Sequence, residues 1–546
     1  MTLAMDSTVV LLCCLLGSSS ADPVVEGSLG KISGTIEKIL DVEVEAFLGI
    51  PYAKPPVEEL RFARPEPFGP VGNLEATELP QQCPQFPMHG SGRYSDIEDC
   101  LYLNVYRKRG TTPEDKKPVL ATIHGGSYSA GSSADVNQSA KSLVGFGDVI
   151  LVSFNYRLGI LGFADMKGNA PGNLGLHDQR LALKWIKENI ADFGGDPEKV
   201  TLMGDSAGSM SVAAQIVSIA DSDQLFHAAI LDGGVVASNG YLEDSESSFT
   251  RIKRIAEIVE CPTECSVGMV TCLRSLPVAA LLANSTTTYG STRISMFMPT
   301  TDGVFLPEDV QAYVANASSR LPKIPIIIGY SLDEGSFFLG SVGDREIEGS
   351  NFDYTREYSR SEILDFCSNI GATFNFPFNA SQGDIREKIG KVYVDENSGV
   401  AKEALSAFLS DGLFKCPINA FIRDYSRHSD KVFAYQFDRK LKKTYFKLLD
   451  PSVLGVFHYS PYLHFAGVIF LDEGPVDEED RKFALDAMDT IANFIKSAGA
   501  PKFRGVEWPE FSSSGKVFIF DETPKVAGSL SREQVCKELF SIDRVA

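Results

Sequence analysis

The segment KVTLMGDSAGSMSVAAQIVSI (199–219) is the strongest indication of the fold, because it joins an apolar strand pattern directly to a helix pattern. KVTLMG (199–204) is an apolar run of strand length, and SMSVAAQIVSI (209–219) is typical of a helix. The residues GDSAG (204–208) between them match the pattern G-x-S-x-G. A strand that turns abruptly into a helix needs glycines around the turn, because a Cβ atom there would collide with neighbouring backbone. The segment therefore predicts a strand, a sharp turn with Ser206 at its apex, and a helix.

Apolar runs of strand length alternate with helical patterns on both sides of this segment. The runs are VLATIH (119–124), DVILVSFNY (148–156), AAILDGG (228–234), KIPIIIGY (323–330) and KVFAYQF (431–437). Helical patterns cover 176–193 and 484–499. Continuous apolar strands that alternate with helices indicate a mostly parallel sheet covered on both faces. No repeat or long linker divides the chain, so we expect one large α/β domain over residues 22–546, with long insertions.

Composition limits the class of protein. The chain has 546 residues, 44% of them hydrophobic and 23% charged, so it can bury a large core. Its formal net charge of −21 disfavours binding to nucleic acid and to anionic membranes. No stretch reaches the ~18 apolar residues that a membrane-spanning helix needs, so we expect no membrane span.

Residues 1–21 have the pattern of a secretory signal peptide. The apolar run VVLLCCLL (9–16) is followed by small residues up to Ala21. The alternative is a buried N-terminal strand. Four Asn-x-Ser/Thr sequons fit a secreted, extracellular glycoprotein: Asn137, Asn284, Asn316 and Asn379.

The eight cysteines after residue 21 indicate disulfide bonds. No two of them have the C-x-x-C spacing, and no histidine cluster lies nearby, so we expect no zinc site. In a secreted chain disulfides are the usual state of cysteine.

Ser206 is a candidate nucleophile. Its position at the turn would raise Oγ to the C-terminal edge of the sheet, near a helix N-terminus that favours developing negative charge. The alternative is that Ser206 only caps the helix. A loop rich in glycine, HGGS (124–127), follows an apolar strand and could supply oxyanion donors together with the Ala207 N–H group.

A nucleophilic serine also needs a general base and an acid that orients it. In the chain order Ser, acid, His, the candidate bases are His458, which closes an apolar stretch, and its rival His464. The apolar run 323–330 leads into Asp333 and Glu334, which places two carboxylates at the end of a strand. The residues alone do not choose between these two acids.

These motifs together resemble the cholinesterase/carboxylesterase (type-B carboxylesterase) family of α/β-hydrolases, from about residue 26 to 540. The matching segments are GIPYAKPPVEELRFARPEP (49–67), EDCLYLNVY (98–106), NYRLGILGF (155–163), the long block 172–209, DEGSFF (333–338), GVFH (455–458) and WPEF (508–511). The resemblance implies an α/β-hydrolase fold. It also implies a serine esterase that needs no metal and no cofactor and acts on a small ester.

The family pattern assigns a role to each candidate. It implies Ser206 as nucleophile, His458 as base, and Glu334 as acid because Glu334 directly precedes Gly335-Ser336-Phe337. The oxyanion donors implied are the N–H groups of Gly126, Ser127 and Ala207.

The family pattern also implies three disulfides and one structural ion pair. The disulfides are Cys83–Cys100, Cys261–Cys272 and Cys416–Cys536, and the ion pair is Arg61–Glu98. Cys265 and Cys367 are left over, either as free thiols or as a fourth bridge.

The chain departs from the family at four positions near the site. Asp205 replaces a glutamate, Ser127 replaces the third glycine of the oxyanion loop, Tyr459 replaces a glycine, and Pro461 stands where glutamate is common. Ser127 would narrow the approach to the site, and Tyr459 and Pro461 would reshape the surroundings of His458.

Two absences bear on the substrate. The segment 83–100 has no tryptophan to hold a quaternary ammonium group, so choline esters are expected to be poor substrates. The segment 293–297 lacks the aromatic pair that narrows the acyl pocket of acetylcholinesterases, which favours a larger acyl group. We therefore expect a secreted carboxylesterase, with a lipase acting at an interface or a catalytically silent adhesion or binding protein as the alternatives. The sequence does not predict the oligomeric state.

Overall fold

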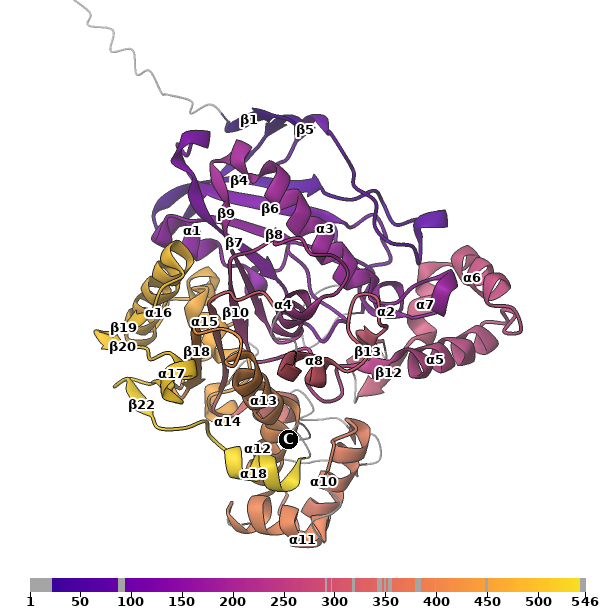
Figure 1. Ribbon diagram of the computed structural model, residues 1–546, viewed down its shortest axis with the longest axis vertical. Helices are drawn as coiled ribbons and strands as arrows, with labels where there is room; N and C mark the ends of the chain where they lie inside the picture. The colour runs from indigo at the N-terminus through magenta and orange to yellow at the C-terminus, as the bar shows by residue number, and fades with distance from the viewer. Residues whose placement is uncertain are drawn as a thin grey trace, which may run out of the picture.

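The computed structural model is built around one large mixed sheet (Figure 1). It describes residues 22–86, 94–289, 292–295, 297–316, 320–340, 346–347, 350–351, 356–378, 384–397, 399–446 and 450–540. The eleven strands stand in the order β22-β21-β18-β15-β10-β9-β7-β8-β6-β4-β3. Their bounds, along the sheet, are Lys525–Ala527, Val517–Phe520, Val432–Phe437, Ile326–Ser331, Ala228–Asp232, Gly195–Asp205, Lys117–Ile123, Ile150–Phe154, Tyr102–Lys108, Val42–Pro51 and Thr35–Ile39.

The centre of the sheet is parallel and its edges are antiparallel. All neighbouring pairs from β8 through β7, β9, β10, β15 and β18 to β21 run parallel. The pairs β6·β8, β4·β6, β3·β4 and β21·β22 are antiparallel. The expected α/β class with a mostly parallel sheet is confirmed. The antiparallel pairs lie at both edges of the sheet, where the early strands β3, β4 and β6 and the late strand β22 are added, and the apolar-run pattern does not distinguish them.

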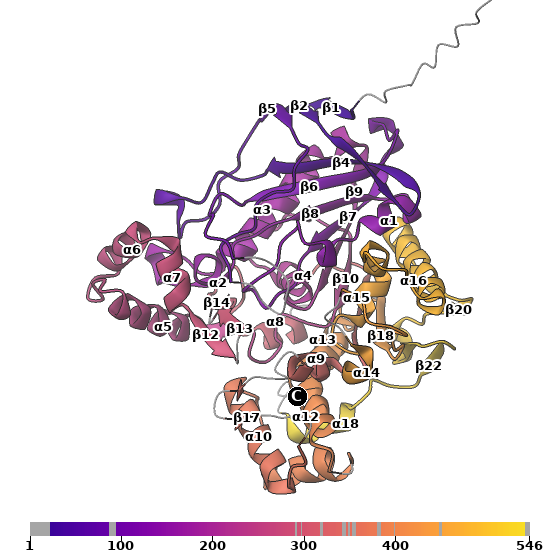
Figure 2. The ribbon, with the colours of Figure 1, turned by 180° about the vertical axis from the view of Figure 1, so that it is seen from behind.

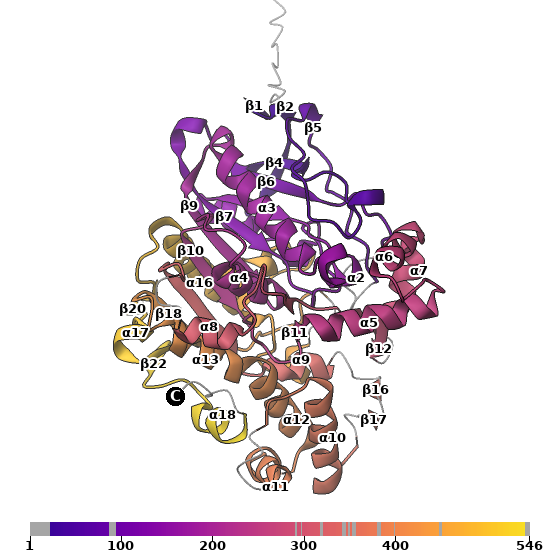
Figure 3. The same cartoon turned by 45° about the vertical axis from the view of Figure 1, so that its right-hand side comes forward.

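Helices cover both faces of the sheet. In β7, Val119, Ala121 and Ile123 belong to one hydrophobic core, and Leu120 belongs to the other. The helices α3 (Leu174–Asn189) and α4 (Ala207–Val217) bury side chains in the first core. The helices α1 (Lys141–Gly147) and α16 (Glu478–Ser497) bury theirs in the second core, on the opposite face of the sheet. Figure 3 shows α3 and α16 on different sides of the central strands. Successive side chains of a strand point to opposite faces of the sheet. A strand that is covered on both faces therefore contributes to one core on each face.

Helix α16 begins earlier than the apolar pattern predicts. Its first turn is Glu478-Glu479-Asp480, and the Asp477 side chain accepts hydrogen bonds from the N–H groups of Glu479 and Asp480. This N-cap and the acidic first turn favour a helix start without any apolar residue. The apolar pattern therefore marks only the buried part of the helix.

A second group of helices lies at one end of the molecule (Figures 1 and 2). It contains α10 (Arg360–Thr373), α11 (Ile385–Ile389) and α12 (Ala401–Leu409). Helix α12 continues without a break into the π-helix η8 (Ser410–Lys415) and then into α13 (Cys416–Tyr425). Single π turns inside longer helices are frequent at functional sites.

The cysteines pair as the family pattern implies. Disulfides join Cys83 to Cys100, Cys261 to Cys272 and Cys416 to Cys536. Of the two cysteines left over, Cys265 is an exposed free thiol and Cys367 a buried one, so they do not form a fourth bridge. Arg61 contacts Glu98 through two hydrogen bonds of 2.6 and 2.7 Å, as expected for a structural ion pair.

Residues 1–21 lie outside the described residues, so the signal peptide stays a prediction. In the part of the chain that the structure describes, no single helix is long and apolar enough to cross a membrane. One bent pair, Ser266–Ser275 with Val278–Asn284, meets the requirement of length and composition only when both helices are counted together.

Candidate active site

Ser206 stands at the apex of a tight turn between β9 and α4. Its backbone has φ 57° and ψ −126°, a conformation that non-glycine residues rarely adopt. A Cβ at Gly204 would lie 2.2 Å from the Gly208 carbonyl carbon, and one at Gly208 would lie 2.1 Å from the Ile123 oxygen. Both glycines are therefore required, as the G-x-S-x-G pattern predicts. The neighbouring strand β10 stabilises the turn, because the Ser206 N–H group donates a hydrogen bond to the Asp232 carbonyl at 2.9 Å.

Glu334 is the carboxylate that contacts the histidine. It follows β15 at the start of α9 (Glu334–Gly340) and is fully buried. Its Oε1 accepts the Ser331 N–H group at 2.6 Å, and its Oε2 is hydrogen-bonded to His458 Nδ1. The neighbouring Asp333 has another task, because its carboxylate accepts the Val456 N–H group at 2.9 Å. Asp333 thus ties the segment before His458 to the end of β15.

His458 is buried, with only 3% of its surface exposed. Its Nε2 is buried and has no hydrogen-bond partner within the described residues, so this nitrogen is available for proton transfer. The rings of Phe414, Phe338 and Phe337 have their centroids 4.7, 5.4 and 5.9 Å from that of the imidazole. The phenylalanines exclude water from one side of the base.

The rival His464 belongs to the core. Its Nδ1 contacts the Ser460 carbonyl at 2.8 Å, and its ring packs 5.2 Å from those of Phe437 and Phe483. Burial lowers its pKa to about 3. The structure therefore does not bring His464 to Glu334.

Two glycines after β10 lie against all three candidate catalytic residues. A Cβ at Gly233 would lie 3.0 Å from His458 Cε1 and 3.4 Å from Glu334 Oε1. One at Gly234 would lie 2.8 Å from the Ser206 carbonyl oxygen. The close approach of this backbone brings together residues from the ends of β9, β10 and β15, as expected for a site at the carboxyl edge of an open α/β sheet.

The glycine-rich loop after β7 lies beside the nucleophile. A Cβ at Gly125 would be 3.2 Å from Ser206 Cβ. Gly126 has φ 109°, and a Cβ there would be 2.1 Å from the Ala130 oxygen. Ser127 has φ 52°, a left-handed conformation in which glycine has no steric cost. The N–H groups of this loop and of Ala207, the first residue of α4, are therefore candidates for an oxyanion hole.

The π-helix η8 supports the turn that carries Glu334. Ser410 Oγ accepts the Gly335 N–H group at 2.8 Å, and Lys415 Nζ donates to the Leu332 carbonyl at 2.7 Å. A Cβ at Gly335 would lie 2.2 Å from the Ser406 oxygen, so the turn packs directly on the helix. Phe414, which contacts His458, comes from the same π-helix.

Tyr459 and Pro461 shape the far side of His458. Tyr459 has φ 85°, and its hydroxyl donates to the Asn137 carbonyl. The Tyr462 ring stacks on that of Tyr459 with centroids 5.6 Å apart, and its hydroxyl donates to the Gln138 carbonyl at 3.0 Å. Pro461 lies in the first turn of α15 (Ser460–Phe465), where its missing N–H group has no cost. These residues connect the histidine segment to the loop that follows HGGS.

Two buried acids near the site have no role in the expectations from sequence. Asp205 precedes the nucleophile, and Asp232 ends β10. Burial, and next the charge of Glu334, raises the pKa of Asp205, whereas burial, and next Asp205, raises the pKa of Asp232. The only signal for Asp232 in the sequence is an acidic residue at the end of the apolar run 228–234.

The expected glycosylation sites differ in their surroundings. Asn137 Oδ1 is buried without a hydrogen-bond partner, whereas Asn316 is exposed. The side-chain amides of Asn284 and Asn316 donate to carbonyls one helical turn earlier. Asn379 lies outside the described residues, as does Met296 of the segment 293–297. All four sites stay predictions.

Comparison with known proteins identifies the family of this chain. A model of the carboxylesterase family matches residues 21–537, a range that contains Ser206, Glu334 and His458. The chain is 32% identical over 536 residues to an acetylcholinesterase from Bungarus fasciatus, covering 94% of this chain and 85% of that relative. It is 31% identical over 543 residues to a cholinesterase from Mus musculus, covering 95% of this chain and 86% of that relative.

Proposed function

The chain belongs to the carboxylesterase family, and we propose that it is a secreted serine carboxylesterase that forms an acyl-enzyme on Ser206. One observation carries the proposal: the buried Glu334–His458 pair and the strained turn at Ser206 meet around Gly233 and Gly234. A histidine with one nitrogen held by a carboxylate and the other free is equipped to act as a general base.

In the proposed reaction, Ser206 Oγ attacks the ester carbonyl and its proton passes to His458 Nε2. The imidazolium then gives this proton to the leaving alcohol, and a water molecule cleaves the acyl-enzyme by the same route. Glu334 orients the imidazole through Nδ1 and stabilises its charged form. The N–H groups of Gly126, Ser127 and Ala207 stabilise the oxyanion.

The substrate is proposed to be a small uncharged ester. The segment 83–100 has no tryptophan, and Trp185 and Trp508 are buried elsewhere. A quaternary ammonium group would therefore lack an indole face. This favours esters of neutral alcohols with an acyl group larger than acetyl.

A catalytically silent binding protein is the second candidate, because Ser127 and Tyr459 place side chains where the family has glycine. Both residues are less than a tenth exposed, and both have positive φ. If their side chains closed the site to esters, the fold and the Glu334–His458 pair would remain but turnover would not.

Hydrolysis of p-nitrophenyl acetate, butyrate and octanoate tests the proposal. We expect turnover that one equivalent of an organophosphate abolishes, with a single adduct on the Ser206 peptide by mass spectrometry. The order of the three rates measures the size of the acyl pocket. No turnover and no adduct from folded protein would overturn the esterase and favour the binding protein. Activity that rises sharply above the solubility limit of the octanoate ester would favour a lipase.

A further inference from the structure

Two carboxyl groups that the triad does not use lie beneath the nucleophile. Asp205 is the last residue of β9 and Asp232 the last of β10, and the parallel register pairs them directly. Paired residues of parallel strands place their side chains on the same face, with strands about 4.8 Å apart. Only 3% of Asp205 and 1% of Asp232 is exposed. The two acids are therefore buried neighbours.

Each of these carboxyl groups has an oxygen without a donor. Asp232 Oδ1 accepts the Tyr435 hydroxyl at 2.5 Å, but Asp232 Oδ2 and Asp205 Oδ1 are buried with no hydrogen-bond partner within the described residues. Neither carboxylate forms an ion pair with lysine or arginine in that part of the chain. Two unpaired buried carboxylates would be costly, and a proton held by one of them supplies a donor for the other.

The groups around the pair do not supply a compensating permanent charge. Glu334 and His458 interact electrostatically with Asp232, as Tyr435 does through its hydroxyl. The hydroxyls of Tyr459 and Tyr462 also lie in the field of both acids. With Glu334 ionised, two further negative charges at this place would repel each other and Glu334.

We propose that Asp205 and Asp232 share one proton, so that the pair holds a single negative charge beneath Ser206 and His458. The proton stays with the pair during the reaction. If the chain is the esterase proposed above, the single charge adds to that of Glu334 in stabilising the imidazolium that forms when Ser206 loses its proton. Asp205 and Asp232 are then positioning residues, because neither contacts the ester.

Infrared spectroscopy tests the shared proton without any need for activity. At pH 7 we expect a protonated-carboxyl band in the wild-type protein that is lost in both D205N and D232N, because the remaining acid ionises next to an amide donor. D223N, which changes an exposed carboxylate, is the matched control and should keep the band. Absence of the band in the wild type would overturn the proposal. A band that persists in both single variants would do the same, since each acid would then be neutral from burial alone.

Tyr435→Phe gives a second test of the same pair. It removes the donor that favours the ionised form of Asp232. The pH at which the infrared band disappears should therefore rise. An unchanged or lower pH would show that Asp232 does not carry part of the shared charge.

The effect on catalysis is measured with the double variant D205N/D232N. Loss of the negative charge destabilises the imidazolium that forms when Ser206 loses its proton, so the acid limb of kcat/KM should move down by about one pH unit and kcat at neutral pH should fall about tenfold. Each single variant keeps one charge and should shift the limb less. An unmoved limb in a folded, active double variant would overturn the catalytic role. If the wild type has no esterase activity, the infrared result still decides whether the proton is shared.

Discussion

His458 and His464 are chemically identical side chains in one short segment, but their surroundings give them different chemistry. Glu334 holds one nitrogen of His458, and its other nitrogen is buried and unbonded. His464 has its Nδ1 on a carbonyl of its own helix and its ring in the core. Of these two histidines, His458 is the one that fits the proposed role of general base. The two histidines are therefore a matched pair for testing the base.

Substitution of the triad residues should abolish ester turnover. We expect Ser206→Ala and His458→Gln each to lower kcat for p-nitrophenyl butyrate by ~10³-fold or more, on the scale of other triad deletions. His464→Gln should cost little. Near-native turnover in Ser206→Ala would contradict the assignment of the nucleophile. Loss of turnover in His464→Gln but not in His458→Gln would show that His464 is the base.

His464 should also make stability depend on pH. Its folded-state pKa is about 3, whereas an unfolded histidine titrates near 6.5. Between these values the unfolded chain binds a proton that the native protein does not, so stability falls as the pH drops below about 6.5. Urea unfolding measures this effect. Between pH 6 and pH 4, the free energy of unfolding of the wild type should fall by up to about 1.4 kcal/mol per pH unit more than that of His464→Gln. Parallel curves for the two proteins would contradict the buried neutral state.

Among the elements, the continuous helix α12–η8–α13 supports the turn that carries Glu334. The π turn of η8 directs Ser410, Phe414 and Lys415 toward the site within six residues. Ser410 and Lys415 hydrogen-bond to the backbone around Glu334, and Phe414 contacts His458. One helix thus supports both members of the buried pair, although it supplies neither.

Ser410→Ala tests this support. It leaves the Gly335 N–H group buried without its acceptor, which should cost about 1–3 kcal/mol of stability. We also expect kcat to fall more than KM rises, because the change acts on the orientation of Glu334. Chemical unfolding and steady-state kinetics measure both effects. Ser426→Ala is the control, since the Ser426 hydroxyl donates to the Arg423 carbonyl of the same helix, α13, and not to the backbone around Glu334. Equal effects of the two substitutions would argue against a special role for η8.

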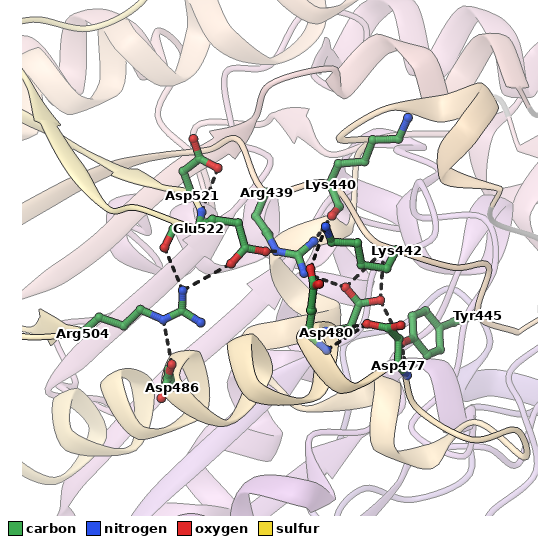
Figure 4. A network of polar contacts seen from close by, with 11 residues as sticks. Arg439, Lys440, Lys442, Tyr445, Asp477, Asp480, Asp486, Arg504, Asp521 and Glu522 are labelled. Carbon is green, nitrogen blue, oxygen red and sulfur yellow. Dashed lines mark hydrogen bonds and ion pairs between the residues drawn. The ribbon is translucent and has the colours of Figure 1, made fainter.

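At the scale of the whole molecule, a polar network ties the C-terminal segments to the sheet (Figure 4). Arg439, just after β18, is 2% exposed and contacts Asp480 of α16 at 2.9 Å and Glu522 after β21 at 2.6 Å. The Tyr445 hydroxyl also donates to Asp480, at 2.9 Å. Arg504 extends the network, since it contacts both Asp486 and Glu522. The network therefore joins helix α16 and the Arg504 segment to the ends of β18 and β21, which pair with each other in the sheet.

Arg439→Met should strongly destabilise the protein. It leaves the buried Asp480 carboxylate without its cation, at a cost of about 3–5 kcal/mol. The double variant Arg439→Met/Asp480→Asn should recover part of this loss, because it removes the unpaired charge. Lys442→Met is the control, since Lys442 pairs with Glu479 at the surface, where solvent screens the pair, and the substitution should change stability little. Chemical unfolding measures all three. A loss no larger than that of Lys442→Met would show that the network does not stabilise the fold.

Features of this protein that depend on local constraints can be predicted from the amino-acid sequence. The strand, turn and helix around Ser206 follow from glycines that must lie within a few residues of each other, because the collision they avoid is local. The class of fold follows from the alternation of apolar strands and helices. The long motifs around these elements were sufficient to indicate the family.

Contacts between residues far apart in the chain depend on long-range packing, which local sequence patterns do not specify. Two acids and two histidines were candidates for the buried pair, and the structure brings Glu334 and His458 together. This contact depends on how the end of β15 packs against a segment 124 residues later. The pairing of Asp205 with Asp232 depends on the register of two strands, which neither strand encodes alone. Burial and hydrogen-bond partners set the chemistry of these side chains, and both arise from contacts between parts of the chain that are far apart in sequence.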